Sequence, residues 1–222
     1  MSLIRKCDAA KRLKNSPKLV CLARTFPKHA EELGNAVPEQ PIFFLKSPNS
    51  IIHNGEPVRL PVGGGEVHHE GEIAVILARP LSNATPEQVC DAIAGYTVLN
   101  DVTERDVQKS EMGRFSRAKS YDTFCPMSDE LLCGVNWSEL SVQCLVNGQV
   151  RQHGYLTDMW MSPFALVAWI SHHMSLNQDD IISLGTPPGV APIVSGDLLE
   201  TRLYLNERQV ITLHNPVMSS QN

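Results

Sequence analysis

The sequence predicts an α+β protein that is rich in short strands. Short apolar runs with many β-branched residues recur along the 222-residue chain, and turns that contain Gly, Asn or Pro separate them. Only two or three segments have the residue pattern of a helix. Strands and helices also do not alternate in a βαβ order, which counts against a Rossmann fold.

Composition and charge exclude several classes of protein. Hydrophobic residues make up 42% of the chain and charged residues 19%, which is typical of an ordinary globular protein. The formal charge of −5 and the lack of a basic patch argue against nucleic-acid binding. No apolar run approaches the about 20 residues that a membrane span requires. Because the N-terminal segment lacks an apolar signal core, we expect a cytoplasmic protein.

We expect residues 1–18 to form a peripheral N-terminal segment and residues 19–222 to form a single domain. The length allows one large domain or two small ones, and no internal repeat or low-complexity linker divides the chain. The six cysteines are irregularly spaced and include no CxxC pair, so reduced and mostly buried thiols are expected. The polar stretch around Cys125 leaves a partly reactive thiol open as the alternative.

Strands are expected at residues 19–23 and at residues 41–46, which end in the cation Lys46. Asn54-Gly55, between two further apolar segments, predicts a β-hairpin. Between these elements, proline near the start and glycine at the end frame a short helix over residues 24–34.

His29 and Glu32 lie three positions apart on this helix and therefore share one face. Their pairing would orient the imidazole and raise its pKa. An ordinary surface pair on a charged helix is the alternative, and the residues alone favour that interpretation.

The segment from Val67 to Glu72 is the most distinctive of the chain. The apolar run that follows it, residues 73–77, predicts a buried strand. Because residues two apart on a strand share a face, Glu70 and Glu72 point together with only a glycine between them. Two adjacent carboxylates at a buried strand need a cation, a shared proton or open water.

Thr85, Pro86 and Gln88 form a helix start with a capping box, and this helix is expected to stop at Gly95. The strand after it, residues 96–99, delivers Asp101. The next segment, up to residue 124, is dense in charge and predicts a loop or a short helix near a polar site.

Asn147-Gly148 predicts a second hairpin, and Ser162-Pro163 begins a helix over residues 164–174. A strand at residues 181–184 then leads into the stiff turn 185–190. Residues 198–205 alternate as the expected final strand.

Glu70, Glu72 and Asp101 all stand at strand ends beside apolar runs. Oxygen ligands favour a hard cation such as Mg²⁺, Mn²⁺ or Ca²⁺ over zinc. His68 shares the side of the glutamates and would serve as a ligand or a neighbour of one, whereas His69 faces away. A solvated acidic edge without a metal remains the alternative at this point.

Several motifs follow one another in order along the chain. They are residues 24–35, Phe43-Phe44-Leu45-Lys46, His68-His69-Glu70-Gly71-Glu72, residues 94–108, Ala118-Lys119-Ser120-Tyr121-Asp122, Val146-Asn147-Gly148 with Arg151-Gln152, and Gly185-Thr186-Pro187. Together they resemble the motifs of the fumarylacetoacetate hydrolase superfamily, especially its small single-domain acylpyruvate hydrolases and oxaloacetate decarboxylases. The resemblance covers residues 19–213, nearly the whole chain.

The resemblance implies a β-rich roll of mixed sheets for the catalytic domain, residues 19–222, and a homodimer. It implies that Glu70, Glu72 and Asp101 bind Mg²⁺ or Mn²⁺, and that His29 and Glu32 form a catalytic dyad on a lid helix. The other residues implied at the site are Lys119 as a further catalytic residue, with Arg24, Arg105, Gln108 and Thr186 around the substrate.

The implied activity is metal-dependent hydrolysis of acylpyruvates, such as fumarylpyruvate, to pyruvate and a carboxylic acid. The metal would stabilise the enolate that forms when the C3–C4 bond of the small 2-oxo acid breaks. Oxaloacetate decarboxylation passes through the same enolate, so it is an alternative. Two more are an isomerase or decarboxylase of a 2-oxo-heptenedioate in aromatic catabolism, and a drifted member that only binds metal or ligand.

The chain departs from the family pattern at a few positions. Phe26 stands where a tyrosine is usual, and the segment 108–119 is short and lacks a tryptophan. Pro188 and Ala191 also differ from the usual residues of their turn. These departures bear on the identity of the substrate more than on the metal ligands.

Overall fold

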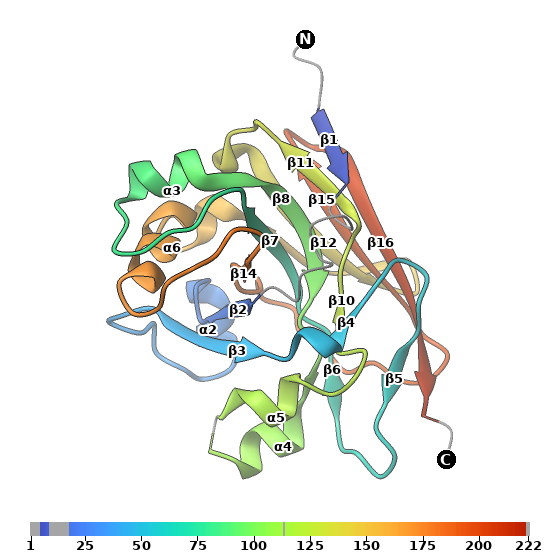
Figure 1. Ribbon diagram of the computed structural model, residues 1–222. Coiled ribbons are helices and arrows are strands. Elements are labelled where there is room, and N and C mark those ends of the chain that lie inside the picture. Colours follow the sequence, from blue (N-terminus) through green and yellow to red (C-terminus); the bar gives the residue numbers. More distant parts are fainter. Residues whose placement is uncertain (1–4, 9–17, 113, 221–222) are drawn as a thin grey trace.

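The computed structural model describes residues 5–8, 18–112 and 114–220, and within them it places the strands in two large sheets and two short pairs (Figure 1). The seven-stranded sheet has the order β1 (Arg5–Asp8), β11 (Glu130–Cys133), β8 (Ile93–Asn100), β7 (Gly71–Leu77), β14 (Ile181–Ser183), β2 (Leu19–Ala23) and β3 (Ile42–Lys46). The five-stranded sheet has the order β13 (Gln149–Tyr155), β12 (Leu140–Val146), β15 (Leu198–Leu205), β16 (Arg208–Ser219) and β5 (Val58–Leu60).

The short pairs join β10 (Cys125–Pro126) to β4 (Ile51–Ile52) and β6 (Val67–His68) to β9 (Thr103–Glu104). Parallel and antiparallel pairings occur in the same sheet, since β14 runs parallel to β2 and antiparallel to β7. The predicted strand-rich α+β class with mixed sheets is therefore confirmed.

Helices are short and lie at the margins of the sheets. They are α2 (Pro27–Glu32), α3 (Pro86–Ala92), α4 (Arg105–Ser110), α5 (Phe115–Lys119) and α6 (Pro163–Ser171), with 3₁₀ turns at Pro48–Ser50, Trp137–Glu139 and Leu156–Asp158. Figure 1 shows α3 and α6 together on one side of the molecule and α4 with α5 at another. Within the described residues, no helix is long and apolar enough to span a membrane.

The core lies between the two large sheets, where β12 and β15 pack on β7 and β8. All seven residues of β7 are buried, because it is a central strand covered on both faces. This explains why the sequence there is a continuous apolar run and not an alternation. The rigid centre holds the residues on either side of Gly71 in fixed positions.

The capping box at Thr85 is confirmed, but α3 ends at Ala92, earlier than predicted, and β8 begins at Ile93. Gly95 belongs to the strand and does not stop the helix. A Cβ at Gly95 would lie 2.5 Å from the carbonyl oxygen of Leu132, so glycine is needed there for close strand packing.

The hairpin predicted at Asn54-Gly55 is wrong, although a turn forms there. β4 pairs with β10, and β5 pairs with β16, so the two flanking strands do not pair with each other. The hairpin at Asn147-Gly148 is confirmed, since Val146 pairs with Gln149. The strand predicted at 198–205 is confirmed as β15, but it is not the final strand, because the twelve-residue β16 follows it. The polar residues on the exposed face of β16 obscured the strand pattern of this segment in the sequence.

The cysteine predictions concern thiols in the core. Cys21, Cys125 and Cys144 are buried free thiols. Burial raises the pKa of Cys125 to about 12, so the alternative of a reactive thiol there is wrong. Most of the predicted peripheral segment 1–18, including the side chain of Cys7, lies outside the described residues; β1 within it pairs with β11 at the edge of the large sheet.

Candidate metal centre and active site

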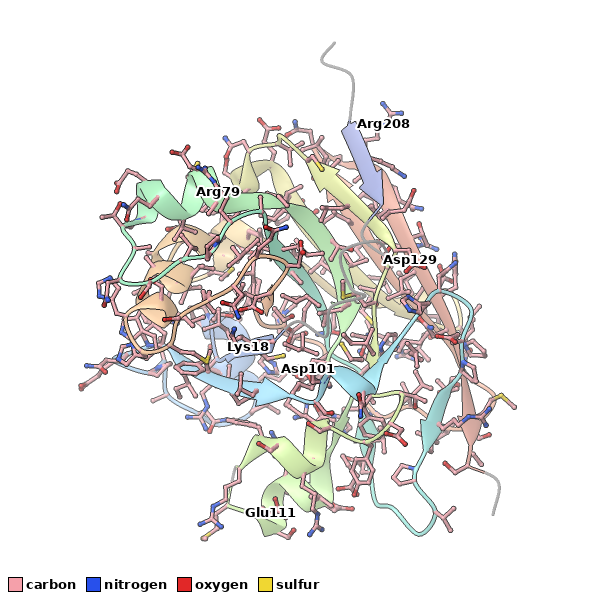
Figure 2. The ribbon with its side chains drawn as sticks, in the orientation of Figure 1. Lys18, Arg79, Asp101, Glu111, Asp129 and Arg208 are labelled. Carbon is pink, nitrogen blue, oxygen red and sulfur yellow. The ribbon has the colours of Figure 1, made fainter. Side chains whose placement is uncertain are left out.

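Three carboxylates meet at the centre of the large sheet. Oxygens of Glu70, Glu72 and Asp101 all lie within 4.8 Å of one another, and the three side chains are buried. Glu70 precedes β7, Glu72 lies within it, and Asp101 follows β8. Gly71 pairs with Asn100, and the Asp101 N–H donates to the Glu70 carbonyl oxygen at 2.8 Å, so strand register brings the three together. Figure 2 shows Asp101 in the interior, with Glu111 and Arg208 at the periphery.

Cationic side chains contact two of these carboxylates. Lys119 donates to Glu70 Oε2 at 2.6 Å and to Asp101 Oδ2 at 2.7 Å, and Arg105 donates to Glu70 Oε1 at 2.5 Å. Burial alone would raise the pKa of Glu70, but the charges of Lys119 and Arg105 hold it well below its usual range. Glu70 is therefore ionised at neutral pH.

Glu72 has a different environment. It accepts hydrogen bonds from the Ser183 hydroxyl and from the Gly185 N–H, and no Lys or Arg of the described residues pairs with it. Burial, together with the charges of Asp101 and Glu70, raises the pKa of Glu72 well above its usual range. A divalent cation would relieve this repulsion. The all-oxygen donor set fits a hard cation such as Mg²⁺ or Mn²⁺.

Neither histidine of the motif joins the carboxylates. β6 ends at His68 and β7 starts at Gly71, so the strand is interrupted between them. His68 Nε2 lies 2.7 Å from Glu66 Oε1 near the surface, and His69 Nδ1 lies 2.9 Å from Gln152 Oε1 in the interior. The interpretation of His68 as a ligand assumed a regular strand, and it is wrong for that reason.

Lys46 is a residue that the sequence analysis did not assign to the site. Its ammonium donates to Asp101 Oδ1 at 2.5 Å and to the Val102 carbonyl oxygen at 3.3 Å, with the side chain fully buried. In the sequence, its position as a cation at the end of the expected strand was the signal that could have indicated a place in the site. Which carboxylate it meets depends on the packing of β3 beside β2.

Lys46→Met is expected to lower the free energy of unfolding by about 3–5 kcal/mol, because it leaves the buried Asp101 carboxylate without one of its cations. Urea denaturation measures this loss. Lys6→Met removes an exposed partner of Glu130 and should cost less than about 1 kcal/mol. A similar loss in both variants would contradict a structural role for the buried pair.

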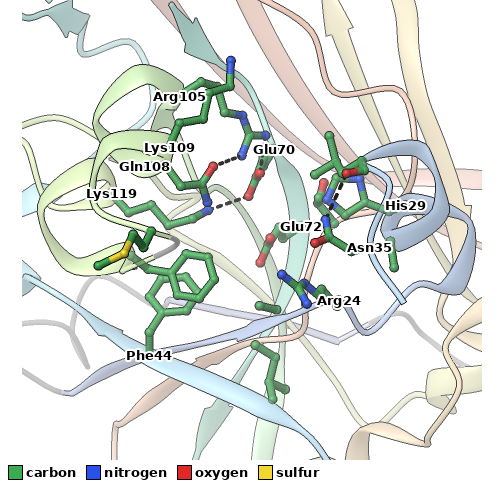
Figure 3. Close-up of a pocket in the computed structure, with 17 residues that line it drawn as sticks. Arg24, His29, Asn35, Phe44, Glu70, Glu72, Arg105, Gln108, Lys109 and Lys119 are labelled. Atoms are coloured by element: carbon green, nitrogen blue, oxygen red, sulfur yellow. Dashed lines mark hydrogen bonds and ion pairs between the residues drawn. The ribbon is translucent and has the colours of Figure 1, made fainter. Parts of the chain in front are cut away.

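His29 and Glu32 lie on α2, which faces the carboxylates. His29 Nδ1 is 3.2 Å from Glu32 Oε2, and both Glu32 oxygens accept from the Gly189 N–H at 3.0 and 3.1 Å. His29 is only 6% exposed, whereas Glu32 is exposed, so the pair joins a buried imidazole to a carboxylate at the surface. In Figure 3, His29 and Asn35 lie across the pocket from Arg105 and Lys119.

A cavity of about 500 Å³ separates the two sides. Of the predicted site residues, those that line it are Arg24, His29, Glu70, Glu72, Arg105, Gln108, Lys119 and Thr186; Asp101 and Glu32 do not line it. Gln108 accepts a hydrogen bond from Arg105 at 2.8 Å. The apolar part of the wall, which the sequence analysis missed, includes Leu33, Phe44, Met112 and Phe115. These residues carry no local signal, because only tertiary packing groups them.

Nearly the whole chain resembles known proteins. Residues 18–218 match the family model described as Fumarylacetoacetate (FAA) hydrolase C-terminal. The chain belongs to this family. The match spans nearly all of the described residues and includes the carboxylate cluster and α2.

Three similar proteins have names that state an activity. The chain is 38% identical over 188 residues to an oxaloacetate tautomerase of Escherichia coli (82% of this chain, 86% of the relative). It is 34% identical over 191 residues to a mitochondrial oxaloacetate decarboxylase of Dictyostelium discoideum (82% and 87%). The crystal structure of a 5-carboxymethyl-2-hydroxymuconate delta-isomerase of Mycobacterium smegmatis is similar, with a TM-score of 0.83, 36% identity and coverage of 93% and 80%.

Proposed function

We propose that this protein is a divalent-metal-dependent enzyme of oxaloacetate, which interconverts its keto and enol forms through the oxaloacetate enolate and can also release CO₂, which leaves the enolate of pyruvate. The observation that carries the proposal is a buried histidine, His29, that faces a buried Glu/Glu/Asp cluster across a pocket lined by cations. The names of the E. coli and D. discoideum relatives support the choice of oxaloacetate.

Glu70, Glu72 and Asp101 would hold Mg²⁺ or Mn²⁺. When bound there, such an ion would polarise the oxygens of a 2-oxo acid and stabilise negative charge that develops on them. Arg105 and Lys119 stand beside Glu70 and would balance the charge of an anionic substrate. Arg24 lines the opposite part of the pocket and could bind a second carboxylate.

His29 would move the proton at C3 of the substrate. A Glu32 oxygen lies next to Nδ1, so a neutral imidazole would donate its Nδ1–H to Glu32 and keep the Nε2 lone pair free as a base. The Gly189 N–H holds Glu32 in place, which in turn orients the imidazole. The enol forms when the enolate oxygen takes up a proton, and in the reverse direction His29 would return a proton to C3.

Acylpyruvate hydrolysis, the activity that the sequence resemblance implies first, is the second candidate. His29 and Glu32 could deprotonate a water that attacks the 4-oxo carbon. The apolar wall around Phe44 and Met112 could also contact the acyl group of an acylpyruvate, in whose place oxaloacetate has only a carboxylate. Isomerisation or decarboxylation of a 2-oxo-heptenedioate is the third candidate. The M. smegmatis relative is named as the isomerase of a hydroxymuconate, which supports the isomerase part of this candidate.

A substrate panel with the purified protein and Mg²⁺ tests these candidates. We expect the enol absorbance of oxaloacetate to equilibrate about 100-fold faster than the uncatalysed reaction, which is the low end of general acid–base catalysis. Pyruvate release, followed with a coupled dehydrogenase, separates decarboxylation and acylpyruvate hydrolysis from tautomerisation. EDTA should abolish the rate enhancement.

Pyruvate released from acylpyruvates, with oxaloacetate unchanged, would replace the proposal by the hydrolase. If no 2-oxo acid reacted but Mg²⁺ and oxaloacetate still bound, the chain would be a binding member of the family.

A further inference from the structure

Gln152 reaches the site from the other sheet. It lies on β13 of the five-stranded sheet and is 1% exposed, yet its side chain forms hydrogen bonds with the segments that flank the pocket. Gln152 does not line the cavity itself. Any effect on chemistry must therefore act through the residues that it contacts.

The amide of Gln152 makes four hydrogen bonds. Its Oε1 accepts from the Gly71 N–H and lies beside His69 Nδ1, both at 2.9 Å. Its Nε2 donates to Thr186 Oγ1 and to the Pro187 carbonyl oxygen, both at 2.7 Å. A backbone N–H can only donate and a carbonyl can only accept, so these two partners fix which end of the amide is which.

Three of these groups form a closed ring. Gln152 accepts from the Gly71 N–H, Thr186 donates its hydroxyl proton to the Gly71 carbonyl oxygen at 3.0 Å, and Gln152 donates to that same hydroxyl. The ring fixes both the position and the proton direction of the Thr186 hydroxyl. It also ties Thr186 to the residue that immediately follows Glu70.

The same strand supports the rest of the turn. A Cβ on Gly154 would lie 2.5 Å from Pro187 Cβ, and a Cβ on Gly189 would lie 2.0 Å from the Arg151 carbonyl oxygen. The turn thus lies flat against β13, and its Gly189 N–H holds Glu32. Gln152, together with the Thr186 hydroxyl, bonds this turn to the segment of Glu70.

We propose that Gln152 is a positioning residue of the active site, which acts through Thr186 by setting the place and proton direction of its hydroxyl relative to Glu70. The role rests on the proposed function, because Thr186 is a pocket wall for the substrate. A general packing role would have different effects. Its loss would lower the amount of folded protein, and the loss of activity would not depend on Thr186.

A double-mutant cycle tests this role. Gln152→Glu keeps the shape and the acceptors but removes both donors, and Gln152→Met removes all four hydrogen bonds without adding a charge. In the wild-type background each should lower kcat/KM for oxaloacetate by about 10- to 100-fold, as is usual for residues that orient a site. In a Thr186→Val background, each should lower it by less than about twofold.

Gln149→Glu is the matched control, because it places the same charge on an exposed position of the same strand. It should leave kcat/KM unchanged. Thermal unfolding of every variant reports the folded fraction. Equal fold losses of kcat/KM in both backgrounds would overturn the proposal. A merely structural defect would lower kcat/KM by the same factor in the wild-type and in the Thr186→Val background.

Oxalate affinity, measured by calorimetry on the Mg²⁺-loaded protein, separates this proposal from the proposed function. If the wild type turns over no 2-oxo acid, the proposed function fails, and the same cycle is then read from the oxalate dissociation constant. Loss of affinity that depends on Thr186 supports the role of Gln152. Equal loss in both backgrounds, or no loss in either, overturns it.

Discussion

Glu70→Ala is expected to abolish divalent-metal binding and every metal-dependent reaction of this protein. The change removes one of three clustered oxygen donors. It also leaves the buried Arg105 and Lys119 without the carboxylate that both contact, so two positive charges would face an incoming cation. Calorimetric titration with Mg²⁺ and Mn²⁺, together with the rate on oxaloacetate, measures both losses.

Glu70→Gln serves as a second variant if the alanine variant does not fold, because it keeps the volume and removes only the charge. Glu66→Ala is the matched control, since Glu66 is an exposed acid of the same segment that pairs with His68. It should bind Mg²⁺ as the wild type does. Mg²⁺ binding that survives Glu70→Gln would refute the proposed metal centre.

His29→Ala is expected to lower kcat by about 10²- to 10⁴-fold, the usual contribution of a positioned acid–base group. Mg²⁺ affinity should stay unchanged, because His29 lies on α2, across the pocket from Arg105 and Lys119. Steady-state kinetics and calorimetry on the same preparation give the two quantities.

The control for this variant is His173→Ala, an exposed histidine just beyond the end of α6 whose Nδ1 lies 2.9 Å from the Trp169 carbonyl oxygen. It should have wild-type activity. An equal loss of turnover and of metal affinity in His29→Ala would show that the histidine supports the cluster and does not transfer a proton.

The fold was predictable where local chemistry was strong. The run after Glu72 could only be a buried strand, and the Thr85 capping box and the Asn147-Gly148 hairpin depend on neighbours in sequence. Pairing between distant strands was not predictable. β16 pairs with both β15 and β5. Because β5, the strand after Asn54-Gly55, pairs with β16, the turn signal at Asn54-Gly55 did not produce a hairpin.

For the site, the residues alone indicated the carboxylate pair, but they favoured an ordinary surface pair for His29 and Glu32. Two glutamates on one face of a strand carry their own signal, because their repulsion requires a partner. His29 and Glu32 have the same spacing on any charged helix. Their distinction is that His29 is buried and that Glu32 accepts from Gly189, 157 positions away.

By itself, the sequence determined the class of fold, the family motifs and the oxygen donors, since periodicity, turn chemistry and charge are local properties. Only the tertiary structure decided which groups act together. In it, Lys46 pairs with Asp101, His68 contacts Glu66 and not the carboxylate cluster, and Gln152 of the second sheet donates a hydrogen bond to Thr186. The physical reason is that a hydrogen bond or an ion pair depends on distances of a few ångströms, and strand register and sheet packing set those distances between residues far apart in the chain.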